Sequence, residues 1–231
     1  MSLSVNLTQT KAARRSMAPM ETSFDILYLA TVLLCGATLC LSSTYGSVRW
    51  LFGIMALVLG VGDAFHLIPR MLALWDRNGR DFTAALGIGK LVTSITMTLF
   101  YVLLWHIGTA HYAAPTAQRL TGAIYGLAAL RIVLCLLPQN RWACGKPDLK
   151  WGVLRNIPFF VQGALVTMLY ATGARLQPDG LSWLWLAILL SFVFYTPVVL
   201  FSGNKPKIGM LMLPKSCCYV AIVLMGFTLP L

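Results

Sequence analysis

Seven apolar segments, each long enough to cross a bilayer, dominate this sequence. The hydrocarbon core of a membrane is about 30 Å thick, which a helix of about 20 apolar residues can span. Charged residues make up only 11% of the 231 residues, against about 25% in an ordinary soluble domain. We therefore predict an all-α membrane protein with seven transmembrane helices. They cover residues 24–43, 48–74, 83–108, 119–138, 157–175, 181–202 and 208–228.

The polar stretches between these segments are too short to form a second domain. Residues 1–22 are predicted to be a basic cytoplasmic tail, and residues 23–231 a single seven-helix transmembrane domain. The first apolar segment follows this tail and lacks a small-x-small cleavage site, so we expect it to be a retained signal anchor.

The net charge of +11 is distributed unevenly between alternate loops. By the positive-inside rule, the basic loops predict a cytoplasmic N-terminus and an outer C-terminus, in a multi-pass protein of the cell (inner) membrane. The expected partners of the excess charge are anionic membrane lipids, and not nucleic acid. The tail and the predicted inner loops contain Lys11, Arg14, Arg15, Arg77, Arg80, Arg141, Lys146, Lys150, Arg155, Lys205 and Lys207, whereas the opposite loops contain Arg49, Arg119 and Arg175.

The six cysteines and three histidines indicate neither a disulfide framework nor a metal site. No cysteine falls in a predicted outer loop, and no C-x-x-C motif is present. His106 and His111 lie at the predicted outer boundary, where a solvated histidine is the ordinary expectation. We therefore expect no metal and no cofactor.

A weak internal repeat relates the first three predicted helices to the last three. Trp50 precedes Asp63 by the same thirteen residues that separate Trp183 from Thr196. With the fourth helix as a linker, this predicts a 3+1+3 arrangement of parallel repeats, as found in some transporters. Chance recurrence of aromatic residues in apolar helices explains the match equally well.

Polar residues inside the apolar segments are predicted to gather in the cytoplasmic half of the membrane. Each charge at the centre of a bilayer costs about 2.5–3.5 kcal/mol on insertion scales, so such residues usually face a cavity or a partner. Asp63 and His66 are three residues apart and share a helix face, which makes them our predicted catalytic, proton-handling pair. The gathered residues are Asp63, His66, Lys90, Arg131, Gln162, Thr196 and Lys215.

The cations in this set outnumber the carboxylates. Lys90, Arg131 and Lys215 accompany Asp63 alone, so we predict that they bind an anionic amphipathic ligand together with Gln162 and Thr196. Two alternatives stay open. Asp63 would be neutralised if it formed a structural ion pair with Lys215 or Arg131. Lys90 and Arg70 could instead extend to the cytoplasmic head groups.

The stretch GDAFHLIPR, followed by LGIGKLVTSITMTLFYV, resembles the lysoplasmalogenase (YhhN-like) membrane family over about residues 55–103. The resemblance implies a multi-helix membrane protein that hydrolyses the vinyl-ether bond of lysoplasmalogens, with Asp63 matching the family's Gly-Asp acid. Two positions depart from the family pattern. Ile95 stands where a histidine is expected, and Thr196 stands near the place of a second acid.

Three functions are therefore open: lysoplasmalogenase-like hydrolysis, proton-coupled transport of a small solute, and non-catalytic binding or sensing of a lipid. Retinal binding at Lys215 is disfavoured, because residues 83–108 offer no carboxylate counter-ion. The sequence leaves the oligomeric state and the ligand's identity open.

Overall fold

The computed structural model describes residues 2–144, 148–201 and 206–230, and every regular element within these ranges is a helix. The predicted all-α class is thus confirmed. The α-helices are α1 (Ser2–Leu41), α2 (Val48–Trp75), α3 (Thr83–His111), α4 (Pro115–Arg119), α5 (Thr121–Leu136), α6 (Leu149–Leu176), α7 (Leu184–Phe201) and α8 (Met212–Met225), and the 3-10 helices are η1 (Pro138–Asn140), η2 (Pro206–Leu211) and η3 (Gly226–Thr228).

Six helical stretches are long and apolar enough to cross a membrane. Large apolar side chains are exposed on the outside of the bundle, among them Leu34, Met168 and Val193. Such a surface is expected where lipid, and not water, surrounds the helices. The chain is therefore a multi-pass integral membrane protein. The six stretches are Ala18–Leu41, Val48–Trp75, Thr83–His111, Leu149–Leu176, Leu184–Phe201 and Ile208–Thr228.

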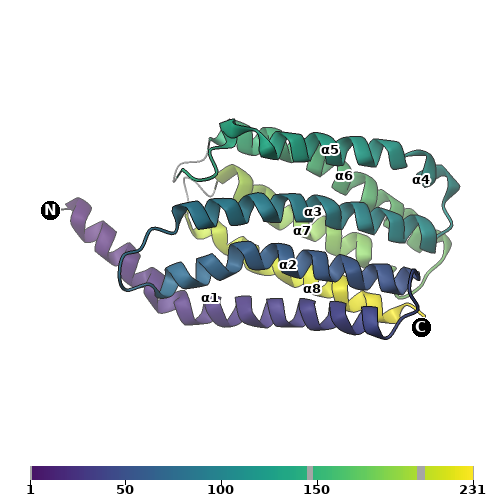
Figure 1. Cartoon of the computed structure of the whole chain (residues 1–231), viewed down its shortest axis with the longest axis horizontal. Coiled ribbons are helices and arrows are strands. Elements are labelled where there is room, and N and C mark those ends of the chain that lie inside the picture. Colours follow the sequence, from purple (N-terminus) through teal and green to yellow (C-terminus); the bar gives the residue numbers. More distant parts are fainter. Residues whose placement is uncertain (1, 145–147, 202–205, 231) are drawn as a thin grey trace.

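The predicted helix at residues 119–138 is shorter than expected. It is interrupted at Leu120, and α5 contains 16 residues, which corresponds to about 24 Å at 1.5 Å per residue. α5 nevertheless runs along the bundle beside α3 and α6, because it connects the end of α3 with the start of α6 (Figure 1). The described residues thus contain seven main helices, and α8 reaches the length of a membrane span only together with the adjoining residues of η2 and η3.

α1 is longer than predicted. It begins at Ser2, within the predicted tail, and its first turns project beyond the end of the bundle (Figure 1). The part of α1 that has the composition of a membrane span begins at Ala18.

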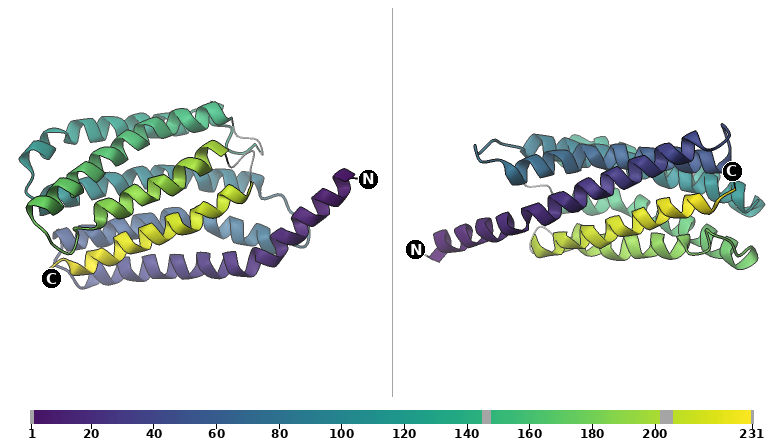
Figure 2. Two further views of the ribbon diagram at one scale, coloured as in Figure 1. Left: turned by 180° about the vertical axis from the view of Figure 1, so that it is seen from behind. Right: turned by 90° about the horizontal axis from the view of Figure 1, so that it is seen from below.

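The main helices form a ring that is closed by contacts between distant parts of the chain. α1, α2 and α3 pack in series, as do α6, α7 and α8. Contacts of α1 with α8 and of α3 with α6 close the ring, and α5 packs against both α3 and α6. Figure 2 shows α8 running beside α1 although the two lie at opposite ends of the sequence. The internal symmetry of a 3+1+3 repeat stays a prediction.

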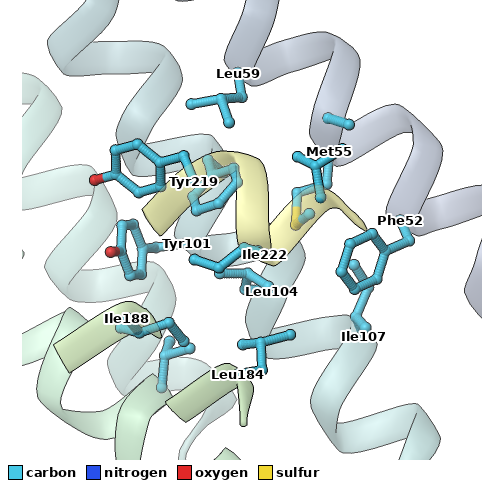
Figure 3. Packing of buried hydrophobic residues seen from close by; sticks show 14 of the residues in the cluster. Phe52, Met55, Leu59, Tyr101, Leu104, Ile107, Leu184, Ile188, Tyr219 and Ile222 are labelled. Carbon is cyan, nitrogen blue, oxygen red and sulfur yellow. The ribbon is translucent and has the colours of Figure 1, made fainter. Parts of the chain in front are cut away.

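Apolar side chains from opposite sides of the ring meet in its interior. Figure 3 shows Phe52 and Met55 of α2, Leu104 of α3, Ile188 of α7 and Ile222 of α8 in one buried cluster. Because lipid is as apolar as these side chains, the cluster stabilises the bundle mainly through close packing. It therefore fixes the positions of the polar side chains that lie next to it.

The two ends of the bundle carry different connections. The α2–α3 connection and the start of α6 lie at the end where α1 enters, and the α1–α2 and α6–α7 connections lie at the opposite end (Figure 1). Arg77 and Arg80 therefore lie at the N-terminal end of the bundle. The predicted orientation, with the N-terminus in the cytoplasm and the C-terminus outside, agrees with this arrangement and stays a prediction.

Glycines allow α2 and α3 to approach each other closely. A Cβ atom on Gly62 would overlap the side chain of Thr96, and a Cβ atom on Gly89 would overlap the backbone carbonyl of Phe65. Small residues at helix contacts are characteristic of membrane proteins, where packing replaces the hydrophobic effect between helices. This contact sets the position of α2, and with it that of Asp63.

Gly89→Ala is expected to lower the free energy of unfolding by about 1–3 kcal/mol, because backbone atoms of α2 must move to admit the methyl group. Thermal unfolding of the purified protein in detergent measures the change. Gly126→Ala on α5 is the matched control, since nothing lies within 4 Å of its added Cβ atom. Equal midpoints for the two variants would show that the α2–α3 contact is looser than described.

Candidate functional site

Asp63 of α2 accepts a hydrogen bond from a tyrosine of α1. The hydroxyl group of Tyr28 donates to Oδ2 of Asp63 at 2.6 Å. α1 and α2 approach closely here, since a Cβ atom on Gly60 would meet the side chain of Leu33. Tyr28 is buried and Asp63 is half-buried. The carboxylate therefore has a phenol as its immediate partner, and a proton can pass between such groups along a hydrogen bond.

Lys215 of α8 places a positive charge near Asp63. The two charges attract each other, but within the described ranges they form no ion pair shorter than 4 Å. The ammonium group lies 4.8 Å from the ring centre of Tyr219 and 5.0 Å from that of Tyr195. Aromatic faces thus hold the cation, and the direct structural ion pair that the sequence left open is not formed.

Arg131 of α5 is a buried cation with unused hydrogen-bond donors. Its side chain is only 2% exposed, and its guanidinium carbon lies 3.5 Å from the ring centre of Phe159 on α6. Nε and Nη1 have no hydrogen-bond partner among the described residues. A buried charge without an anion or hydrogen-bond partners costs several kcal/mol, and an anion or an ordered water beside these donors would lower that cost.

Gln162 lies one turn beyond Phe159 on α6 and shares its helix face. The side chain is 0% exposed, and its Nε2 donates to the carbonyl oxygen of Thr98 at 3.5 Å. Its Oε1 has no partner in the part of the chain that the structure describes. A second polar group is therefore left unsatisfied close to Phe159, the residue that also contacts Arg131.

Aromatic hydroxyl groups border the same region. Arg131 and Lys215 are both electrostatic neighbours of the tyrosines of α7 and α8. Figure 3 shows the hydroxyl groups of Tyr101 and Tyr219 on one side of the apolar cluster, and that of Tyr101 lies 3.4 Å from Oγ of Ser191. We call this region the polar interior. It comprises Tyr28, Asp63, Tyr101, Arg131, Gln162, Tyr195, Lys215 and Tyr219.

Three of the predicted site residues make no described hydrogen bond to a side chain of the polar interior. The side chain of Lys90 is exposed at the bundle surface. The hydroxyl group of Thr196 donates to the carbonyl oxygen of Phe192 in its own helix at 2.7 Å. His66 is half-buried, and its Nδ1 has no partner among the described residues, Asp63 included. Counting along each helix predicted the depth of these residues but not the direction of their side chains.

Arg70 is bound within the protein. Its Nη2 lies 2.6 Å from Oε2 of Glu21, and its Nη1 lies 3.7 Å from Oδ2 of Asp25. The extension of Arg70 to the lipid head groups, which the sequence left open, stays a prediction. Asp25 is only 3% exposed, so α1 brings a second buried carboxylate into the bundle. The spacing of Glu21 and Asp25, one helical turn apart, was the signal in the sequence that indicates a shared face.

At the opposite end of the bundle, His111 of α3 pairs with Asp179 of the α6–α7 connection. The hydroxyl group of Tyr112 also donates to Asp179, at 3.4 Å. Burial and the negative charge of Asp179 raise the pKa of the Tyr112 phenol. His111 is therefore held by a carboxylate, where the sequence predicted a solvated histidine. Among the described residues, no group of three or more His, Cys, Asp or Glu side chains could hold a metal ion.

Comparison with known protein families and with curated proteins finds no match to this chain.

Proposed function

We propose that the protein binds an anionic, single-chain lipid, whose acidic head group occupies the polar interior. Arg131 and Lys215 supply the positive charge, and the free Oε1 of Gln162 accepts a hydrogen bond from a hydroxyl group of the ligand. The observation that carries this proposal is the burial of Arg131 with two guanidinium nitrogens, Nε and Nη1, that have no hydrogen-bond partner among the described residues. Within the polar interior two cations accompany one carboxylate, Asp63, and an anion beside Arg131 would neutralise that local surplus. The carboxylates of Glu21 and Asp25 share Arg70 on the α1 side.

For the chemistry we propose lysoplasmalogenase-like hydrolysis, with Asp63 as the proton donor. A proton adds to the double-bond carbon that is not bonded to the ether oxygen. Water then attacks the other carbon, which has become part of an oxocarbenium ion. The hemiacetal that results breaks down to a fatty aldehyde and a water-soluble glycerophosphodiester. Asp63 supplies the first proton and recovers one from the attacking water, which is general acid–base catalysis. The support comes from the resemblance of residues 55–103. Because Tyr28 donates to Oδ2 of Asp63, the transferred proton would be carried on Oδ1.

Purified protein in detergent, incubated with a lysoplasmalogen, is expected to release fatty aldehyde. The matched control substrate is the saturated alkyl-ether analogue, which should bind and remain intact because it has no double bond to protonate. Binding of both lipids without aldehyde release would favour the lipid-binding or sensing alternative. Proton-dependent uptake of a solute into proteoliposomes without any product would favour transport. Absence of binding would contradict the proposal as a whole.

A further inference from the structure

Polar side chains of α1 and α2 form a seam along the contact between these two helices. Glu21, Asp25 and Tyr28 are spaced i, i+4 and i+7 on α1, so they share one face of that helix. Asp63 and Arg70 have the same i, i+7 spacing on α2, which runs antiparallel to α1 (Figure 1). Tyr28 therefore meets Asp63, while Glu21 and Asp25 meet Arg70. We call these five residues the α1–α2 seam.

The α1–α2 seam is accessible at one end and buried further along. The side chain of Arg70 is 29% exposed and that of Glu21 is 17% exposed. Both lie toward the end of the bundle where α1 enters, since Arg70 belongs to the last two turns of α2 (Figure 1). Asp25 and Tyr28, in the following turns of α1, are both buried. Water at this end of the bundle is therefore separated from Asp25 by one turn of α1.

Asp25 is a buried carboxyl group that shares its cation with a second carboxylate. Its Oδ2 atom lies 3.7 Å from Nη1 of Arg70 and has no hydrogen-bond partner among the described residues. Nη2 of the same guanidinium group lies 2.6 Å from Oε2 of Glu21. Two carboxylates and one cation leave one negative charge without a counter-charge of its own. Burying such a charge is costly, and a proton on Asp25 would remove it.

The other ionisable groups of the neighbouring helices do not balance Asp25. Within the described part of the chain, the charges that act on it are those of Arg70, Glu21 and Asp63, and Asp63 is a further carboxylate. The remaining groups on α2, α3 and α8 act on Asp63, on Arg70 or on one another, and not on Asp25; they are His66, Lys90, Lys215 and Tyr219. Arg70 is thus the cation on which Asp25 depends.

We propose that Asp25 binds a proton at neutral pH and exchanges it with water through the exposed end of the α1–α2 seam. The proton resides on Asp25 and not on Glu21, because Glu21 is more exposed and has the shorter contact with Arg70. A metal cation does not suit this position, since the guanidinium group beside both carboxylates repels it. The site keeps a proton near Asp63 whatever ligand the polar interior binds, so it does not rest on the proposed function.

Infrared spectroscopy of isotope-labelled protein in lipid nanodiscs tests this proposal, because a protonated carboxyl group has a carbonyl-stretching band that a carboxylate lacks. Glu21 is the only glutamate in the chain, so carbon-13 glutamate reports on Glu21 alone. At neutral pH, labelling of aspartate is expected to shift the band of the protonated acid, and labelling of glutamate to leave it in place. Deuterium oxide should also shift the band. Absence of the band, a shift with labelled glutamate, or a band that deuterium oxide leaves unchanged would overturn the proposal.

The Asp63→Asn variant separates Asp25 from the other carboxyl group of the seam that lies inside the bundle. The aspartic acid band should persist in Asp63→Asn and disappear when Asp25→Asn is added. Its disappearance in Asp63→Asn alone would place the proton on Asp63 and contradict the proposal. Neither lipid binding nor hydrolysis enters this measurement, so failure of the proposed function would leave its outcome unaffected.

Thermal unfolding in detergent at neutral pH gives a second measurement. Asp25→Asn should leave the midpoint unchanged, because the amide has the size and the charge of a protonated carboxyl group. Glu21→Gln is the matched control on the same face of α1; it removes the shorter contact with Arg70 and should lower the midpoint by several degrees. An equal loss in Asp25→Asn would show that Asp25 is an ionised partner of Arg70, contrary to the proposal.

Discussion

Arg131→Met is expected to stabilise the ligand-free protein and to abolish its stabilisation by lysophosphatidic acid. The guanidinium group is buried, and two of its nitrogens have no hydrogen-bond partner among the described residues. Replacing a buried charge by an apolar side chain of similar length is often neutral or stabilising, by about 1–4 kcal/mol. In the unmodified protein, a ligand present at about 100 times its Kd adds about 2.7 kcal/mol of stability. This increment should disappear in the variant.

Thermal unfolding in detergent, with and without lysophosphatidic acid, measures both effects. Arg155→Met is the matched control, because Nη1 of Arg155 donates to Oδ1 of Asn140 at 2.7 Å and its guanidinium carbon lies 4.2 Å from the Trp142 ring centre. That variant should lose about 1–3 kcal/mol and keep its response to the lipid. If Arg131→Met were destabilised to the same extent and still responded, Arg131 would have a purely structural role.

Asp63→Asn is expected to lower the rate of vinyl-ether hydrolysis about 10²–10⁴-fold, which is the usual contribution of a general acid. The amide keeps the size of the side chain and can still accept a hydrogen bond from Tyr28, so lipid binding should be retained. Aldehyde release and lipid binding, measured on the same preparation, distinguish a loss of catalysis from a loss of binding.

Thr196→Val serves as the control for Asp63→Asn. The hydroxyl group of Thr196 already donates a hydrogen bond to the carbonyl oxygen of Phe192 within α7. Its loss should therefore change the rate of hydrolysis by less than about twofold. Undiminished aldehyde release in Asp63→Asn would exclude Asp63 as the proton donor. A comparable loss of rate in Thr196→Val would show that the ligand reaches α7.

The helices could be predicted well from the sequence, because lipid selects long apolar runs. The predicted segments 48–74 and 83–108 agree closely with α2 and α3. The segment at 119–138 was less accurate, since the interruption at Leu120 separates α4 from α5 among residues of unchanged hydropathy. Hydropathy likewise could not show that 3-10 helices, η2 and η3, flank α8.

The polar interior could be predicted only in part. Asp63, Arg131, Gln162 and Lys215 border the interior of the bundle, whereas their shared depth in the membrane stays a prediction. Depth does not specify which way a side chain points, which is why Lys90 was misplaced.

Tyr28 was missed for a different reason. Its hydrogen bond to Asp63 joins residues 35 positions apart, and such a pairing depends on how the ring of helices closes. A tyrosine within an apolar helix gives no indication of this partner in a single sequence.

The most direct test is an experimental density map of the protein with bound lysophosphatidic acid. We predict phosphate density about 3 Å from Nε or Nη1 of Arg131, the usual distance for charge-assisted hydrogen bonds. A map in which the Arg131 donors bind only water, and in which lipid occurs only on the outer surface of the bundle, would contradict the proposed site.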